Sequence, residues 1–208
     1  MNLEEIKLEY LQDELKQDDL HSDPLEQFKK WMEQILKAEV SYPNAAFLSS
    51  CDEQGMPDSR TVLIKSFGDA GFRFYTNYLS KKGRDFTHNN KASLLFYWKE
   101  FDRQVRINGF VHKCSRLESE EYFNSRSRES KASAIISPQS HKISREDLIE
   151  QYQTLLEGDK ELVCPTHWGG FDLTPTQFEF WQGRPNRFHD RFQYTQSKNS
   201  WLITRLGP

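Results

Sequence analysis

The feature that most restricts the fold is a succession of short strand-like segments that begins at Ala45. Within Asp102–His112, the apolar residues Val105, Ile107 and Val111 alternate with polar ones and therefore share one face of a strand. Turn sequences separate these segments, so neighbouring strands are expected to pair in an antiparallel sheet. The sequence predicts strands over residues 45–51, 60–67, 72–77, 92–98, 102–112, 177–182, 187–194 and 201–205. We therefore predict a mainly β (α+β) fold, in which helices surround an antiparallel barrel.

Helical segments precede and interrupt these strands. Asp23 is placed to cap a helix that starts at Pro24 and runs to about residue 38, with Phe28, Trp31, Ile35 and Leu36 as its apolar stripe. Further helices are predicted over residues 3–15, 80–90, 117–125, 129–136 and 145–157. We assign residues 1–20 to a separate, mobile N-terminal helical segment and residues 21–208 to a single domain.

Composition argues against several classes of function. The chain has 28 basic and 31 acidic residues and a net charge of −3, so no overall field attracts nucleic acid or an anionic membrane. Its three cysteines are far apart, which disfavours a disulfide framework or a zinc site. No apolar run is long enough to span a membrane, and the N-terminal stretch is acidic, unlike a secretory signal. We expect a cytoplasmic globular protein without a bound metal.

A cationic cluster occurs at the start of one predicted helix. Ser80 suits the N-cap, which places Lys81, Lys82 and Arg84 in the first helical turn. Cations are mildly unfavourable at this positive end of the helix dipole unless an anion binds among them. The cluster therefore predicts a site for an anion such as phosphate, with a solvated lysine-rich loop as the alternative.

A second unusual charge pattern occurs in the predicted C-terminal strand over residues 187–194. Strict alternation would place Arg187, His189 and Arg191 on one face of this strand, with Phe188 and Phe192 on the other face, packed on the core. Three such groups side by side repel one another unless an anionic or π-rich ligand lies against them. Because the aromatic Trp181 lies just upstream, we favour a binding site over an exposed charged strand face.

Tyr122, Arg126 and Ser130 form a third group, spaced at intervals of four residues. In a continuous helix they would share a face and present a phenol, a guanidinium and a hydroxyl, which suit a phosphate monoester. An ordinary polar surface helix is the commoner explanation of such spacing.

The chain has neither GxGxxG after a strand nor GxxxxGK[ST], so any phosphate must be held by side chains and helix ends on another scaffold.

The C-terminal stretch closely resembles the signature of the pyridoxamine/pyridoxine 5′-phosphate oxidase family. Phe178-Glu179-Phe180-Trp181-Gln182 is followed, after four positions, by Arg187-Phe188-His189-Asp190-Arg191. Other segments match the family in order and spacing, namely Arg60–Lys65, Phe74–Asn77, Ser80–Lys82, Gln104–Arg106, Tyr122–Arg126, Gln139–Ser140 and Trp168–Phe171. The resemblance covers essentially residues 6–208 and implies an FMN-binding split β-barrel.

The resemblance also implies ligands and site residues. It implies a homodimer with FMN at the subunit interface, in which Arg60 and Lys82 hold the flavin phosphate and Lys81 takes the usual arginine position. The implied FMN-binding residues are Arg60, Thr61, Val62, Leu63, Ile64, Lys65, Tyr75, Thr76, Lys81, Lys82, Gln104, Gln139, Ser140, Trp181 and Arg191. The implied substrate-binding residues are Lys65, Tyr122, Arg126, Ser130, Arg187 and His189, with Arg187 and His189 as the catalytic pair.

The implied reaction is the oxidation of pyridoxamine or pyridoxine 5′-phosphate by O2, which yields pyridoxal 5′-phosphate and H2O2, with NH3 from the amine, in vitamin B6 biosynthesis and salvage. Two alternatives are another FMN split-barrel oxidoreductase and a non-catalytic protein that binds FMN or pyridoxal phosphate. Three residues depart from the family pattern: Phe188 replaces an aliphatic residue, Ser127 interrupts an expected Arg-Pro-Arg, and Lys7 replaces an arginine. Because of Lys7, residues 7–10 are left out of the predicted site.

Overall fold

The computed structural model describes residues 10, 14–198 and 200–208. Within these residues, nine strands form a sheet with the order β2-β1-β5-β6-β7-β4-β3, and β8 pairs with both β7 and β9. The strands are β1 (Ala45–Cys51), β2 (Pro57–Leu63), β3 (Ser66–Gly68), β4 (Gly71–Asn77), β5 (Lys91–Trp98), β6 (Arg103–Lys113), β7 (Trp168–Gln182), β8 (Asp190–Ser197) and β9 (Ser200–Leu206). The helices are α1 (Pro24–Lys37), α2 (Lys81–His88), α3 (Arg116–Asn124), α4 (Arg128–Ile136) and α5 (Arg145–Glu157). The predicted antiparallel split barrel with surrounding helices is confirmed.

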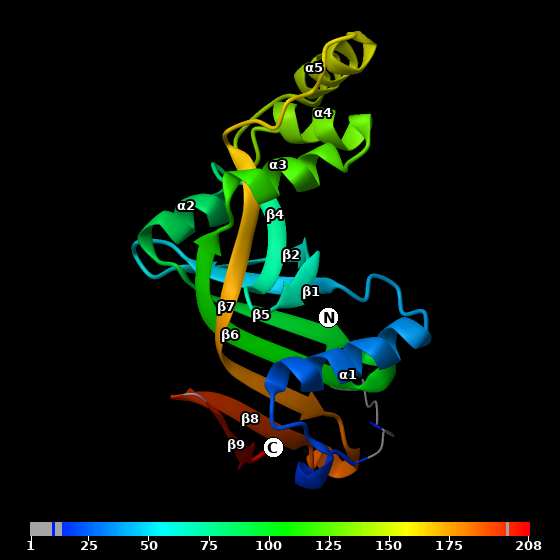
Figure 1. Cartoon of the computed structure of the whole chain (residues 1–208), viewed down its shortest axis with the longest axis vertical. Coiled ribbons are helices and arrows are strands. Elements are labelled where there is room, and N and C mark those ends of the chain that lie inside the picture. Colours follow the sequence, from blue (N-terminus) through cyan, green and yellow to red (C-terminus); the bar gives the residue numbers. More distant parts are fainter. Residues whose placement is uncertain (1–9, 11–13, 199) are drawn as a thin grey trace, which may run out of the picture. The chain divides into compact units, whose positions relative to one another are not determined.

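The chain divides into two compact units, whose elements can be followed in Figure 1. The first unit comprises residues 1–48, 93–109 and 175–208, and the second comprises residues 49–92 and 110–174. The division of the chain at residue 20 stays a prediction, and most of the predicted helix over residues 3–15 lies outside the described residues. No helix in the described part of the chain is long and apolar enough to cross a membrane.

Helix α1 provides much of the core of the first unit. It has the predicted aspartate N-cap and begins with proline, as its sequence indicates. Phe28 packs with ring centroids 4.9 Å from Phe96 of β5, and Trp31 lies 5.2 Å from Phe180 of β7. Burying each such aromatic side chain contributes about 1.5–3 kcal/mol. Leu36 is 55% exposed, so the predicted apolar stripe was one residue too wide.

In the second unit, β4 pairs antiparallel with the first half of β7, from Phe72 opposite Leu173 to Asn77 opposite Trp168. Helix α2 docks on this pair through Phe86, whose ring lies 5.3 Å from that of Phe171. The chain between β4 and α2 is therefore short and held at both ends. This arrangement places the first turn of α2 next to the end of β4, where the polar residues of the site begin.

Strand β7 is much longer than the predicted strand over residues 177–182, because it already begins at Trp168. The first half of β7 was not predicted, because glycine and proline are disfavoured in strands and it contains Gly169, Gly170 and Pro175. The absence of a side chain at Gly169 lets the Tyr78 side chain pack against the strand, because a Cβ there would lie 2.1 Å from the hydroxyl oxygen of Tyr78.

The predicted strand over residues 187–194 is wrong for its first three residues, because β8 begins at Asp190. Residues 185–187 form a 3-10 turn that starts with proline, and Asn186 and Arg187 have φ of 55° and 62°. The alternation argument requires extended backbone, so Arg187, His189 and Arg191 do not form one strand face. Phe188 accordingly does not pack on the core, and 74% of its surface is exposed.

Gly83→Ala should destabilise the protein by about 1–3 kcal/mol, although Gly-to-Ala changes inside helices are normally favourable. A Cβ at Gly83 would lie 2.1 Å from the carbonyl oxygen of Tyr78, so α2 could not keep its place beside β4. Urea denaturation measures the change. Gly68→Ala is the matched control, since its Cβ would meet no atom within 4 Å. Equal stability of the two variants would contradict the close packing of α2.

Candidate active site

The second unit contains a cavity of about 570 Å³, a size typical of small-molecule sites. It is lined by Thr61, Val62, Leu63, Lys65, Tyr75, Thr76, Lys82, Tyr122, Ser125, Arg126, Ser130, Gln139 and Trp168. All of these except Ser125 and Trp168 are residues that the sequence predicted for FMN or substrate. The fold therefore brings most of the predicted residues of this unit to one place.

Lys82 is the most unusual charged group of this cavity. Its side chain lies in the first turn of α2, which Ser80 caps as predicted, and the residue is only 7% exposed. The ammonium donates to hydroxyl and amide oxygens of Thr76 (3.2 Å), Ser80 (3.3 Å) and Gln139 (3.3 Å), all of them neutral. Burial, together with the charge of Arg60, lowers the pKa of Lys82 to about 8. A buried ammonium held by neutral oxygens at a helix N-terminus suits an anionic ligand.

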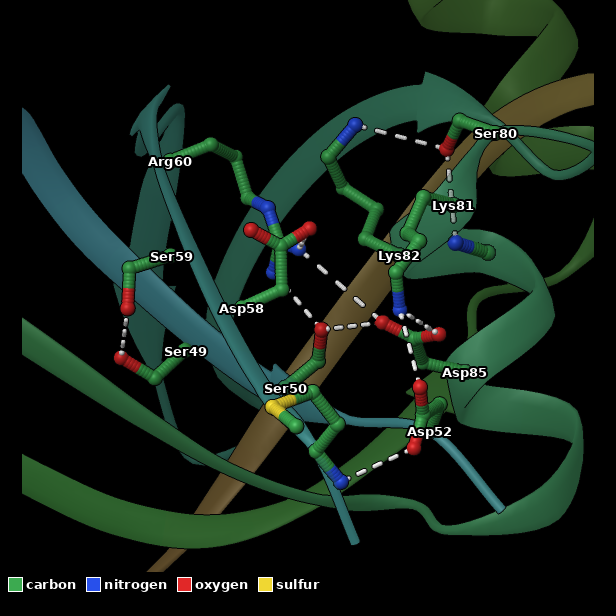
Figure 2. A network of polar contacts seen from close by, with 12 residues as sticks. Ser49, Ser50, Asp52, Asp58, Ser59, Arg60, Ser80, Lys81, Lys82 and Asp85 are labelled. Carbon is green, nitrogen blue, oxygen red and sulfur yellow. Dashed lines mark hydrogen bonds and ion pairs between the residues drawn. The ribbon is translucent and has the colours of Figure 1, made fainter. Parts of the chain in front are cut away.

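The neighbouring cations are compensated by carboxylates, as Figure 2 shows. Arg60 donates to Asp58 at 2.6 Å, and Lys81 lies 2.9 Å from Asp85 and 3.7 Å from Asp52. Figure 2 also shows the Lys82 ammonium on the hydroxyl of Ser80 rather than on these carboxylates. The prediction from charge alone was therefore too simple, because Lys81 is compensated by Asp85 of the same helix and by Asp52, and Arg60 by Asp58. The binding roles of Arg60 and Lys81 stay predictions.

Tyr122, Arg126 and Ser130 lie together on the cavity, but not on one continuous helix as their spacing suggested. Tyr122 is in α3, Arg126 is in the connection, and Ser130 is in the first turn of α4. Ser127 begins the new helix by accepting a hydrogen bond from the backbone N–H of Ser130. The residue that departs from the family pattern therefore caps α4, and the three groups converge across a helix break.

Arg126 has the features of an anchor for a second anion. Its guanidinium stacks 4.9 Å from the centre of the Trp168 ring, and burial lowers its pKa. Its buried NH1 atom has no hydrogen-bond partner among the described residues. Leaving a charged donor unsatisfied costs more than about 1–3 kcal/mol, so such a group is typical of a ligand site. Tyr75 and Tyr122 stack at 3.8 Å beside it and form an aromatic wall.

The first unit contains a smaller group around His189. The imidazole lies 4.8 Å from the ring of Trp181 and 5.2 Å from that of Tyr10. Its Nδ1 accepts the backbone N–H of Arg184 at 3.1 Å, so the neutral ring carries its proton on Nε2. Burial is the main cause that lowers the pKa of His189, with the charge of Arg187 as the next. The ring is therefore a neutral Nε2–H donor near neutral pH.

The remaining predicted residues have different surroundings. Arg191 lies in β8 and donates to Glu179 at 2.9 Å and to the Gly207 carbonyl at 2.8 Å. Gln104 is half-buried in β6, and Arg187 is exposed in its turn. In the second unit, Ile64 is buried, and Ser140 follows Gln139 with a left-handed φ of 69°.

Sequence reasoning missed several residues of these groups. Trp168 lies within a segment that resembles the family but was not predicted for the site, although it lines the cavity and stacks on Arg126. Tyr10 was left out because of Lys7, although its ring contacts Trp181 and His189. Asp58 was missed because the predicted strand began at Arg60, whereas β2 begins at Pro57 and places both residues on one face.

The split barrel contains a cavity that joins the buried Lys82 and the half-buried Arg126 to stacked aromatic rings, an arrangement that suits flat, phosphorylated ligands. The sequence matches the family described as pyridoxamine 5′-phosphate oxidase over residues 32–152, and the pyridoxine 5′-phosphate oxidase C-terminal dimerisation region over residues 168–208. It is 47% identical over 199 residues to the pyridoxine/pyridoxamine 5′-phosphate oxidase 1 of Hydrogenovibrio crunogenus, which covers 93% of this chain and 92% of that protein. The chain belongs to the pyridoxamine 5′-phosphate oxidase family.

Solved structures agree with this assignment. PhzG from Burkholderia lata 383, solved in complex with tetrahydrophenazine-1-carboxylic acid, is 32% identical and matches with a TM-score of 0.90 over 95% of this chain and 99% of its own. An FMN-binding protein of Nostoc punctiforme, described as related to pyridoxamine 5′-phosphate oxidase, is 15% identical and matches with a TM-score of 0.70 over 87% of this chain and 97% of its own. The second likeness supports the fold alone.

Lys82→Met should raise the stability of the flavin-stripped protein at pH 7 by roughly 1–3 kcal/mol. The pKa of Lys82 is lowered from 10.5 to about 8, so below pH 8 the folded protein contains a buried, protonated ammonium that reduces its stability. Between pH 8 and 10.5 the unfolded chain binds more protons here, so wild-type stability rises and the advantage of the variant shrinks. Urea denaturation at pH 7 and pH 10 measures both effects.

Lys65→Met is the control, because Lys65 lines the same cavity but is exposed, and its loss should change stability by less than about 0.5 kcal/mol. A Lys82→Met protein less stable than wild type at pH 7 would show that the ammonium is stabilised by its neutral partners.

Proposed function

We propose that this protein is an FMN-dependent oxidase that converts pyridoxamine 5′-phosphate and pyridoxine 5′-phosphate to pyridoxal 5′-phosphate, with O2 as electron acceptor. The observation that carries the proposal is the presence of two cations, the buried Lys82 and the half-buried Arg126, on one cavity with an aromatic wall. Two phosphorylated flat ligands, one the cofactor and one the substrate, require two such anchors. The names of the similar full-length relatives support the same substrates.

FMN is the cofactor, and the donors present in the second unit fit its phosphate. Lys82, with Thr76 and Gln139 around its ammonium, holds this phosphate, and Arg60 joins it. The segment from Thr61 to Lys65 and Tyr75 line the rest of the flavin. When bound, FMN supplies the two-electron chemistry, accepting a hydride from the substrate carbon and passing the electrons to O2.

The protein works as a homodimer, and the matched dimerisation region over residues 168–208 supports this state. Both subunits contribute to each flavin site, whose remaining residues are Gln104, Ser140, Trp181 and Arg191. The proposal follows the family arrangement. Closed, isologous dimers are the commonest oligomers, and such an interface repeats the same site twice.

The substrate phosphate is held by Arg126, Tyr122, Ser130 and Lys65. The unpaired NH1 atom of Arg126 supplies a charge-assisted hydrogen bond that the described part of the protein does not itself satisfy. The anchored phosphate fixes the distance from the substrate ring to the flavin. Such positioning is the main contribution that the chain makes to a hydride transfer.

Arg187 and His189 hold the pyridine ring. Because the Nδ1 of His189 is occupied by the Arg184 N–H, the imidazole can only donate through Nε2, and it does so to an oxygen substituent of the ring. The lowered pKa keeps the ring neutral, so His189 orients the substrate and does not accept a proton from it. Arg187, with its planar guanidinium, covers the ring and donates hydrogen bonds.

A second candidate is the oxidation of a flat polycyclic carboxylic acid, favoured by the TM-score of 0.90 with PhzG, whose structure contains tetrahydrophenazine-1-carboxylic acid. A carboxylate could bind Arg126, but it offers fewer acceptor oxygens than a phosphate to the hydroxyls of Tyr122 and Ser130. The discriminating experiment measures H2O2 formation by the yellow, FMN-loaded protein with pyridoxamine 5′-phosphate, pyridoxine 5′-phosphate and tetrahydrophenazine-1-carboxylic acid. Turnover of the carboxylic acid alone would overturn the main proposal.

Arg126→Met should raise KM for pyridoxine 5′-phosphate by roughly 10–100-fold, since one charge-assisted hydrogen bond is worth about 1.5–3 kcal/mol. The kcat/KM for unphosphorylated pyridoxine should not change, and FMN should stay bound. Steady-state kinetics with both substrates measures the difference. Arg145→Met, an exposed arginine of α5, is the control. An equal loss with both substrates would argue that Arg126 does not bind phosphate.

His189→Gln should retain more activity than His189→Asn, because the glutamine amide can place an N–H where Nε2–H lies, whereas asparagine can reproduce only the Nδ1 position. The measurement is kcat/KM for pyridoxamine 5′-phosphate, alongside ¹⁵N NMR of histidine-labelled wild type, in which Nδ1 should be the unprotonated nitrogen at pH 7.5. A proton on Nδ1, or a better asparagine variant, would refute the orienting role.

A further inference from the structure

The charged network around the start of α2 is neutral before any phosphate is counted. Arg60 and Lys81 pair with the carboxylates of Asp52, Asp58 and Asp85, and the Lys82 ammonium lies within the field of this network without an ion pair to it (Figure 2). A phosphate that binds here therefore meets negative charge as well as positive charge. The carboxylates differ in burial, and this difference separates their roles.

Asp85 is a structural member of the network. The residue is 3% exposed, and its carboxylate accepts hydrogen bonds from Ser50 at 2.6 Å and Lys81 at 2.9 Å. These bonds and the charges of Lys81 and Arg60 outweigh burial and lower its pKa. A carboxylate with these partners is fixed, since removing it would leave buried donors unpaired.

Asp58 is different, because it faces Arg60 from the same strand and remains accessible to water. The two residues are two positions apart in β2 and so lie on one face, with their side chains 2.6 Å apart. The Asp58 side chain is 43% exposed, whereas that of Arg60 is 18% exposed. The pKa of Lys82 is lowered by the charge of Arg60 and raised by that of Asp58, so all three groups share one local field.

We propose that Asp58 competes with the FMN phosphate for Arg60 and thereby sets the affinity of the protein for its flavin. The proposal rests on the proposed phosphate site at Lys82 and Arg60. Asp58 is a positioning residue that acts through Arg60: its carboxylate holds the guanidinium in place and must share it with an incoming phosphate. Its exposure lets it be rehydrated when the phosphate takes over the guanidinium, which the buried Asp85 cannot be.

The charge arithmetic gives the direction of the effect. A phosphate monoester carries close to two negative charges at pH 7, so a carboxylate on the same guanidinium repels it. Neutralising Asp58 removes this repulsion, so more of the positive charge of Arg60 acts on the phosphate, while Ser50 and, at 3.9 Å, Asp85 remain partners of the guanidinium. Asn at this position can still accept a hydrogen bond from Arg60, so the orientation of the guanidinium is kept.

The experiment titrates the full-length chain, stripped of flavin, with FMN and with riboflavin, and follows flavin fluorescence. Asp58→Asn should bind FMN about tenfold more tightly than wild type and riboflavin equally tightly, because riboflavin has no phosphate. The FMN advantage should shrink in high salt, which screens the exposed carboxylate. Glu53→Gln is the matched control: it removes one exposed negative charge near His88, and its FMN affinity should equal that of wild type.

Two results would overturn the proposal. An unchanged ratio of FMN to riboflavin affinity in Asp58→Asn would show that Asp58 does not compete with phosphate. A weaker FMN affinity would show that its charge helps Arg60 to bind phosphate. Failure of the phosphate site itself is distinguishable, because wild type would then bind FMN and riboflavin equally and Lys82→Met would leave their ratio unchanged.

Discussion

The burial of the Lys82 ammonium is the constraint on which the phosphate side of the site depends. A lysine that is 7% exposed, and whose hydrogen-bond partners among the described residues are neutral oxygens, is unfavourable in the folded protein, in line with its pKa of about 8. The surrounding structure holds it there all the same. Ser80 caps α2, Phe86 docks the helix on β7, and the missing side chain of Gly83 lets the helix approach the chain after β4. Core packing thus stabilises a position that electrostatics alone would not.

Arg126 is a second cation that the surrounding structure removes partly from water, although different elements cover it. Trp168 covers one face of the guanidinium, while a break between α3 and α4 brings Tyr122 and Ser130 around it. In both places burial lowers the pKa of a cation and leaves donor capacity for a ligand. Sites of this kind are expected to reduce stability in exchange for binding, because a desolvated charge interacts more strongly with its ligand than a solvated one.

The sequence predicted those parts of the fold that depend on local rules. The aspartate cap of α1 and the serine cap of α2 were predicted at the right residues, because a cap is decided within three or four positions. Alternation predicted β6 to within one residue at each end. The first half of β7 was not predicted, because its glycines are required by contact with Tyr78, a residue far away in sequence. The carboxylate partners of Arg60 and Lys81 were missed although two of them are close in sequence. Asp58 lies before Arg60, where the predicted strand began, and Asp85 lies one turn after Lys81 in α2.

The segment that ends at Arg191 shows why a correct resemblance can accompany a wrong local structure. The alternation of cationic and aromatic residues over 187–192 resembles a strand, but β7 and β8 already pair from Gln182 opposite Asp190. The seven residues between these two must therefore form the connection. Pro185 and two left-handed residues make it tight, and the backbone N–H of Arg184 turns inward onto His189. The signature thus encodes a turn that fixes the tautomer of one imidazole, and this backbone contact, not a shared strand face, is what limits His189 to donating a hydrogen bond.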